Sequence, residues 1–186
     1  LVSVRKAGET QNDIYQLSLL DKSIRRITQT TANEYSPRID PSGQRVTVVR
    51  QVEGDSIDQQ VYQSALKGGG YKSLTPGIKD IGYYTWVDQD QLALYRIDGE
   101  SSHLVSLNLK DNRTRRITSS IGRTLLADAS GSILYVHKFT DTYWYIKKYN
   151  PSSSTIDIIS ETPGLVEDFT VAPDGTYFIG VGSKLY

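Results

Sequence analysis

The stretch Ser36-Pro37-Arg38-Ile39-Asp40-Pro41-Ser42-Gly43, followed by Arg45-Val46-Thr47-Val48-Val49-Arg50, opens one complete copy of a unit that the chain repeats. After a polar loop, the copy continues as Val61-Tyr62-Gln63-Ser64-Ala65-Leu66 and closes with Tyr71-Lys72-Ser73-Leu74-Thr75. These are four short extended runs separated by turn residues, and a β-propeller blade consists of four antiparallel strands. The stretch therefore predicts an all-β fold built from such blades.

The third strand of this unit recurs along the chain at a regular distance. Copies begin at Ile14, Val61, Leu104 and Tyr145, so the steps are 47, 43 and 41 residues. A fourth-strand pattern recurs in phase with them, at 24–28, 71–75, 114–118 and 156–160. A period of roughly 40 to 45 residues is expected when one blade is one repeat.

The phase of the repeats divides 1–186 into blade parts of one propeller segment. These parts are 1–28, 34–75, 80–118, 122–160 and 165–186, or about four to five blades. Both ends contain a second strand, at 1–5 and 177–181, so a ring closed from these parts alone would have one strand too many. We therefore expect part of a six- or seven-bladed ring. The chain starts at Leu1 and contains no Met, which indicates a mature form, a trimmed chain or an internal fragment.

The composition restricts the function. Lys+Arg and Asp+Glu are both 21, and this balance argues against a general binder of nucleic acid or of anionic membranes. No apolar run approaches the roughly 18 to 20 residues that span a bilayer. The chain has no cysteine and two histidines, His103 and His137, which are too sparse for a zinc site. We predict no metal and no cofactor.

The repeat resembles that of the TolB-like β-propeller family. The resemblance rests on Ser36-Pro37, Pro41-Ser42-Gly43, Ile14-Tyr15, Arg25-Arg26-Ile27-Thr28 and Ala172-Pro173-Asp174-Gly175. It covers essentially the whole chain, although the blades after Asp80 and Gly122 lack the prolines. It implies a periplasmic or extracellular setting. Members of this family include envelope scaffolds and propellers that precede α/β-hydrolase peptidase domains, and related propellers act as sugar lyases.

A cationic or titratable residue recurs at the end of each second strand. These residues are Arg5, Arg50, Arg96 and His137. Equivalent positions in different blades point to the same face of a propeller, so the four predict a positive surface for a carboxylate, a phosphate or an acidic sugar. The alternative interpretation is local pairing, with each cation bound to acids in the following loop. Those acids are Glu9 for Arg5, Glu53 and Asp55 for Arg50, Asp98 and Glu100 for Arg96, and Asp141 for His137.

Other patterns favour structural roles. The pairs Arg25-Arg26 and Arg115-Arg116 lie on predicted outermost strands, where charge blocks edge-to-edge aggregation. Neighbouring aromatic residues at 83–86 and 143–145 alternate between opposite faces of a strand, which favours packing between blades over a sugar-stacking platform. Asp88-x-Asp90 and Asp174-Gly175 lack the ligand series of a calcium loop and are interpreted as turns.

These observations predict a non-catalytic propeller module that binds a protein or peptide, in a bacterial cell envelope, with an acidic glycan as a further possible ligand. The predicted contact residues are Arg50, Arg96 and His137, with Glu34, Asp80 and Arg123 from the loops that enter the inner strands. No Gly-x-Ser-x-Gly nucleophile elbow is present. The alternative is a propeller that gates a serine-peptidase domain outside this chain. A lyase of acidic sugars would need clustered histidines for a metal, which the sequence lacks.

Overall fold

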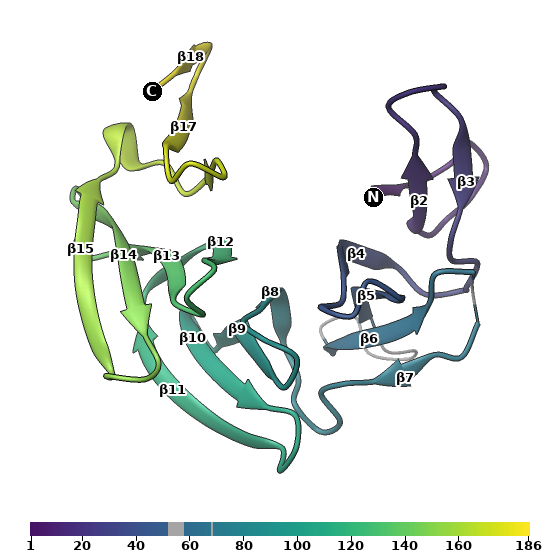
Figure 1. The fold of residues 1–186 in the computed structure, drawn as a ribbon, viewed down its shortest axis with the longest axis horizontal. Coiled ribbons are helices and arrows are strands. Elements are labelled where there is room, and N and C mark those ends of the chain that lie inside the picture. Colours follow the sequence, from purple (N-terminus) through teal and green to yellow (C-terminus); the bar gives the residue numbers. More distant parts are fainter. Residues whose placement is uncertain (52–57, 68) are drawn as a thin grey trace. The chain divides into compact units, whose positions relative to one another are not determined.

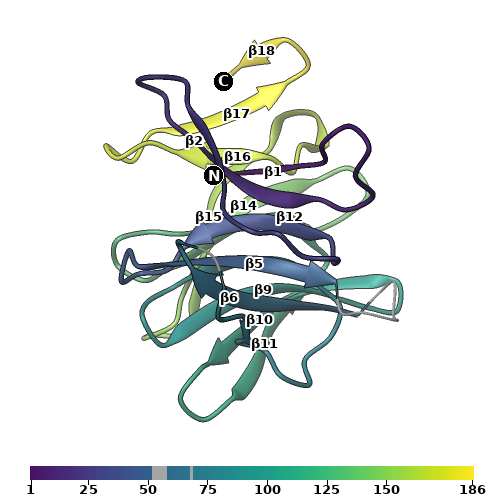
Figure 2. The same ribbon diagram turned by 90° about the vertical axis from the view of Figure 1, so that its right-hand side faces the viewer.

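The computed structural model describes residues 1–51, 58–67 and 69–186. The chain divides into two compact units, Leu1–Tyr84 and Thr85–Tyr186, which we describe separately. The described residues form five sheets of three or four strands, in which sequence neighbours pair as antiparallel meanders (Figures 1 and 2). This arrangement confirms the all-β prediction of propeller blades and gives five of them.

The first unit contains two sheets. The three-stranded sheet has the order β1-β2-β3, with β1 (Val2–Val4), β2 (Asp13–Leu17) and β3 (Ile24–Arg26). The four-stranded sheet has the order β4-β5-β6-β7, with β4 (Glu34–Ile39), β5 (Arg45–Gln51), β6 (Gln59–Ala65) and β7 (Lys72–Ser73). Their shared core consists of Ile14, Ile27, Val46 and Val48.

The second unit contains most of the remaining three sheets, and β8 (Ile81–Trp86) crosses the division between the units. The sheet β11-β10-β9-β8 adds β9 (Gln91–Asp98), β10 (Ser101–Asn108) and β11 (Arg113–Ser119). The next sheet has the order β12-β13-β14-β15, with β12 (Ile121–Ala127), β13 (Ile133–Lys138), β14 (Trp144–Asn150) and β15 (Thr155–Glu161). A 3₁₀ turn, Pro163–Leu165, leads to the three-stranded sheet β16 (Phe169–Val171), β17 (Tyr177–Val181) and β18 (Lys184–Leu185).

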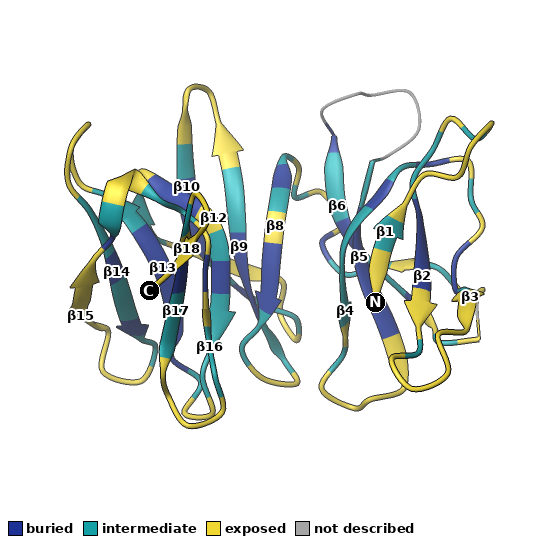
Figure 3. Cartoon of the chain, turned by 90° about the horizontal axis from the view of Figure 1, so that it is seen from above, coloured by how far each residue is buried: buried dark blue, intermediate teal, exposed yellow. Residues whose placement is uncertain are grey.

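Two apolar clusters hold the second unit together. One joins β9 and β10 to the sheet of β12–β15 through Leu104, Leu125, Ile133 and Tyr135, among others. The other packs Leu134, Val136 and Ile146 against Phe169 and Ile179 of the last sheet. The sheet β12–β15 therefore directs alternate side chains toward the sheets on its two sides, as the pleat requires. The middle strands β5, β9 and β13 accordingly contain long runs of buried residues, dark blue in Figure 3.

The threonine that ends the fourth-strand pattern ties the outer part of a blade to its third strand. The Ile14 N–H donates to the Thr28 hydroxyl over 2.8 Å, and the Val61 N–H donates to the Thr75 hydroxyl over 3.0 Å. Both threonines are buried. Because a buried backbone donor without an acceptor is costly, this hydroxyl gives the motif a structural reason.

Aspartates fix the turns between first and second strands. The Asp40 carboxylate accepts the N–H groups of Gln44 and Arg45, and Gly43 has a φ of 73°, which favours glycine. Asp88 accepts the Asp90 N–H over 2.7 Å in the same manner. Both are side-chain-capped turns, which confirms the turn interpretation of Asp88-x-Asp90.

Candidate functional site

Two of the predicted contact residues, Glu34 and Arg50, face each other in the first unit. Glu34 begins β4 and is the register partner of Arg50, near the end of β5. The Arg50 guanidinium carbon lies 5.3 Å from the ring centres of both Tyr62 and Tyr71. A guanidinium at this distance from two aromatic rings is held by cation–π attraction. The acids that local pairing assigned to Arg50, Glu53 and Asp55, lie outside the described residues.

Glu34 is fully buried, at 0% exposure. One of its carboxylate oxygens accepts a 3.2 Å hydrogen bond from the Thr30 hydroxyl, while Oε2 has no partner among the described residues. Burial raises the pKa of Glu34, an effect that hydrogen bonds from Thr28 and Thr30 oppose. Burial also raises the pKa of Tyr71 to about 12, with the nearby Glu34 charge adding to it. Glu34 is therefore a supporting group beneath Arg50 and Tyr71 rather than an exposed contact.

We expect Glu34→Gln to improve stability more at high pH than at low pH. Folded Glu34 holds its proton at pH values where the unfolded chain has lost it, so its contribution is complete below its ordinary pKa of 4.5 and is lost as the pH rises through the folded pKa. The advantage of Gln should therefore grow between acidic and alkaline pH, by about 1.4 kcal/mol for each tenfold difference in proton affinity between the folded and unfolded states. Urea unfolding at both pH values measures it. The matched control is Glu161→Gln, at an exposed carboxylate, and an equal effect of Glu34→Gln at both pH values would contradict this account.

A cluster of charged side chains around the fully buried Asp13 lies close to Glu34 and includes Arg26, which the sequence placed on an outermost strand. Arg26 contacts Asp13 with one terminal nitrogen and Glu9 with the other, the latter at 2.9 Å. Asp13 is fully buried and also accepts the Thr30 N–H. The predicted pairing of Arg5 with Glu9 is therefore wrong, because Glu9 binds Arg26. Arg5 donates to the Asn12 side chain over 3.2 Å.

Asp80 lies directly before β8 and has a φ of 61°, in the left-handed region. Its neighbour Lys79 forms a 2.7 Å ion pair with Asp58, which precedes β6. Asp80 itself is half-buried. The structure thus places it at the entry of an inner strand, as the sequence predicted, and gives it a defined backbone conformation.

Arg96 and His137 occupy the ends of β9 and β13 in the second unit. Arg96 pairs in register with His103, and His137 pairs with Ile121 and Tyr145. Burial lowers the pKa of His137, and the nearby Lys147 charge lowers it further. His137 is therefore neutral at physiological pH and adds no positive charge to this surface. Its Nδ1 is buried without a partner among the described residues.

Arg123, on β12, contacts two acidic residues, Asp168 and Glu167, and Glu167 also contacts Lys138 next to His137. Its guanidinium binds Asp168 through two hydrogen bonds of 3.1 and 2.7 Å, and its N–H donates to Glu167 over 3.0 Å. The other oxygen of Glu167 forms an ion pair with Lys138. Lys138 follows His137 in the sequence, and its ammonium lies 4.7 Å from the Trp144 ring centre.

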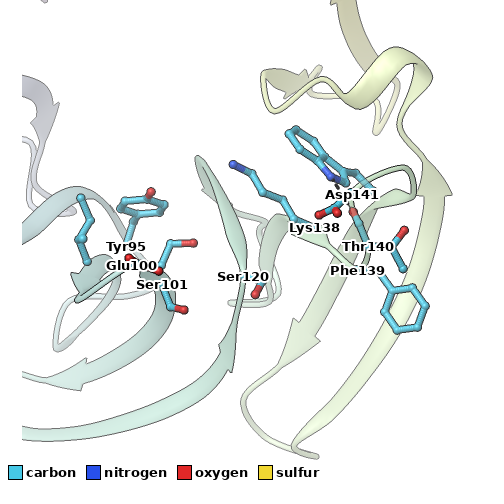
Figure 4. A pocket seen from close by; sticks show the side chains of 11 residues that line it. Tyr95, Glu100, Ser101, Ser120, Lys138, Phe139, Thr140 and Asp141 are labelled. Atoms are coloured by element: carbon cyan, nitrogen blue, oxygen red, sulfur yellow. Dashed lines mark hydrogen bonds between the residues drawn. The ribbon is translucent and has the colours of Figure 1, made fainter.

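A pocket of about 570 Å³ opens beside these residues, between the β9–β10 hairpin and the β13–β14 hairpin. Lys138 reaches across it toward the side formed by Tyr95 (Figure 4). We call it the hairpin pocket, and its lining combines aromatic, acidic and hydroxyl side chains: Tyr95, Ile97, Glu100, Ser101, Ser102, Ser120, Lys138, Phe139, Thr140, Asp141 and Trp144. Such a mixture suits a peptide that offers both apolar and polar groups.

The sequence did not identify the residues of the hairpin pocket as a site. It selected Arg96 and His137, but the pocket is lined by the residues that follow them, Ile97 and Lys138. Side chains alternate along a strand, so a shift of one residue changes the face. The usable signal was Trp144, which packs against the apolar cluster between the last two sheets, as predicted, and also lines the pocket.

Neighbouring aromatic residues at the start of the third sheet behave as predicted. Tyr84 is fully buried and donates its hydroxyl to Thr47 over 2.7 Å, whereas Tyr83 is exposed. Alternation therefore prevents a continuous aromatic platform there.

Among the described residues, no group of three or more His, Cys, Asp and Glu side chains is placed to hold a metal ion. Within the same part of the chain, no helix has the length and apolar character needed to cross a membrane.

The sequence matches no protein-family model, and comparison with curated proteins finds no match. Solved structures do match. TolB from Acinetobacter baumannii superposes with a TM-score of 0.69 at 19% identity, over 90% of this chain and 42% of that one. A putative TolB from Agrobacterium tumefaciens gives 0.71 at 20% identity, over 88% and 61%. The propeller domain of the Trilobed protease from Pyrococcus furiosus gives 0.59 at 14% identity, over 83% and 56%.

The repeated four-stranded sheets and these superpositions define a β-propeller. More particularly, the fold is that of a TolB-like propeller, as the sequence motifs predicted. The chain spans about 42% and 61% of the two TolB structures.

Proposed function

We propose that this chain is a non-catalytic module that binds a protein or peptide and serves as a scaffold in the bacterial cell envelope, in a periplasmic or extracellular setting. The observation that carries the proposal is the hairpin pocket, which lies between two neighbouring blades and presents aromatic and charged side chains together. The contact residues we propose in the second unit are Arg96, His137 and Arg123, at the same sheet ends as the pocket. In the first unit they are Arg50 and Asp80, with Glu34 supporting Arg50.

The charges around the pocket support recognition of a polar chain. Lys138 is already paired with Glu167, whereas Glu100 and Asp141 on the lining are exposed. Phe139 is 63% exposed and lies 6.1 Å from the Tyr145 ring in an edge-to-face contact. An exposed aromatic side chain that is held in place is typical of a binding hot spot.

The test is selection of peptides by the immobilised chain from a random twelve-residue display library. We expect enriched peptides whose affinity falls about tenfold or more in Phe139→Ala, because hot-spot truncations typically cost more than 1 kcal/mol. Arg96→Ala tests in the same assay whether the opposite face of β9 contributes. Isothermal titration of synthetic copies of these peptides measures the affinities. Arg50→Ala tests the first unit in the same assay.

The matched control is Tyr186→Ala, which truncates an exposed aromatic residue outside the pocket. All variants should keep the circular dichroism spectrum of the parent chain. Failure to enrich any peptide, or peptides that bind every variant as well as the parent, would reject the proposed pocket.

The second candidate is a propeller that gates the catalytic domain of a prolyl-oligopeptidase-like serine peptidase outside this chain. Similarity to the Trilobed protease propeller favours it. Its test is hydrolysis of fluorogenic peptides by the full natural gene product, with loss of activity in the presence of a serine-directed inhibitor.

For the ring itself, we propose that 1–186 is one segment of a six- or seven-bladed propeller. The mass of the natural gene product checks this, since two further blades would add roughly 80 to 90 residues.

A further inference from the structure

The outermost strands of the sheets differ in charge, and β15 is the exception among them. Four outermost strands in the described part of the chain contain Lys or Arg: β3, β7, β11 and β18. The fifth, β15, reads Thr-Ile-Asp-Ile-Ile-Ser-Glu and has no cation. All seven of its residues are exposed, so the strand is coloured as exposed along its length in Figure 3.

The outer edge of β15 presents backbone groups that can pair with another strand. It is the last strand in the order β12-β13-β14-β15, so the backbone N–H and C=O groups that point away from β14 have no strand partner in this sheet. Lysine and arginine on an edge strand discourage the addition of another strand. The three arginines of β11, the corresponding strand of the preceding blade, supply that protection, and β15 lacks it.

The side chains of β15 add an apolar row. Ile156 and Ile158 pair with Tyr149 and Lys147 of β14, so both isoleucines lie on one face. They are 43% and 63% exposed, respectively. An added strand would cover this row, and each of its alternate side chains would contact an isoleucine.

The charge of β15 selects the kind of strand that fits. Its charged residues are Asp157 and Glu161, both acidic. Lys148, the register partner of Asp157, already forms a 2.7 Å ion pair with Asp128. A second copy of β15 would bring four carboxylates onto two paired strands, whereas Lys or Arg on the added strand would face opposite charge.

We propose that β15 is a docking edge that accepts an extended, basic segment of another protein as a fifth strand of its sheet. This surface is separate from the hairpin pocket and uses backbone pairing rather than a cavity. The chain itself contains a sequence with the required chemistry. Residues 144–150, Trp-Tyr-Ile-Lys-Lys-Tyr-Asn, form β14 and already pair antiparallel with the inner edge of β15, with Lys148 opposite Asp157.

The probe is therefore a capped synthetic peptide with the sequence of residues 144–150, added in millimolar excess to the whole chain. Hydrogen exchange followed by mass spectrometry should show slower exchange within 155–161. Ile158→Lys, which gives β15 the charge that the other edges have, should weaken peptide binding about tenfold or more, because both the apolar contact and the charge attraction are lost. A peptide in which both lysines are replaced by glutamate should bind the parent chain about tenfold or more weakly than the lysine peptide does.

The matched control is Thr114→Lys, which adds the same charge to the exposed edge strand β11 and should leave peptide binding unchanged. Both substituted positions are exposed, so the fold should be retained. No protection of 155–161 by the lysine peptide overturns the proposal. So does protection that persists unchanged in Ile158→Lys. Sedimentation of the chain alone tests the remaining outcome. If the chain is a dimer that Ile158→Lys dissociates, β15 pairs with a second copy of this chain, and the proposal of a different partner protein is overturned.

Discussion

Asp13→Ala should destabilise the chain by about 1.5–3 kcal/mol, the range for losing hydrogen bonds that involve a charged group, because Asp13 is buried while its partner Arg26 is partly exposed. Asp13 is fully buried, contacts the Arg26 guanidinium and accepts the Thr30 N–H over 3.2 Å. The substitution leaves Arg26 with Glu9 as a carboxylate partner and with the Thr28 carbonyl, and it removes the acceptor for the Thr30 N–H. Because the same segment places Thr30 against Glu34, we also expect a looser environment for Glu34. Urea unfolding followed by circular dichroism measures the loss.

Glu9→Gln is the matched control, because it removes the more exposed carboxylate that binds the same guanidinium. Both side chains of this pair are in part reached by solvent, and solvent-screened ion pairs contribute about 0–1 kcal/mol, so this variant should unfold close to the parent. Equal losses in Asp13→Ala and Glu9→Gln would show that the burial of Asp13 does not determine its contribution. If Asp13→Ala fails to fold, Asp13→Asn keeps the acceptor oxygen for Thr30 and should show an intermediate loss.

Thr75→Val should cost about 1–3 kcal/mol, the penalty for leaving a buried donor without its acceptor. Valine has nearly the shape of threonine, so the apolar contacts remain while the hydroxyl that accepts the Val61 N–H is lost. Thr28→Val should lose at least as much, because it removes the acceptor for the Ile14 N–H in the preceding sheet and also the Thr28 hydrogen bond to Glu34. Chemical denaturation of the two variants measures both losses.

Thr114→Val provides the comparison, since Thr114 is exposed on β11. Surface substitutions of this kind usually stay within about 0.5 kcal/mol. Should Thr75→Val and Thr114→Val unfold alike, the repeated threonine would owe its place in the motif to something other than this hydrogen bond.

The repeats predicted the strands because their signals are local. Alternating apolar residues set each strand, and Asp40, Pro41 and Gly43 set the following turn through contacts within a few residues. The same locality explains the confirmed turn at Asp88. Blade parts could therefore be located from spacing alone, and the superposition on TolB structures confirms the fold that the motifs suggested.

The site was less predictable, because charge partners are chosen by packing. Glu9 is four residues from Arg5 and yet binds Arg26, since the β2–β3 hairpin brings Arg26 beside it. His137 resembled a cation in the sequence, but burial lowers its pKa and leaves it neutral. Glu34 resembled a loop residue at the mouth of a blade and is fully buried.

The sequence by itself determined the strand repeat, its turns, the threonine that ends three of the four fourth-strand copies and the absence of thiol chemistry. Only the tertiary structure decided which side chains meet: the lining of the hairpin pocket by Tyr95 and Trp144, the burial of Asp13 with Arg26, and the unprotected edge of β15. The physical reason is range. Turn geometry and strand alternation depend on residues that are close in the sequence. Desolvation and ion pairing depend on which sheets pack together, and therefore on residues that are distant in the chain.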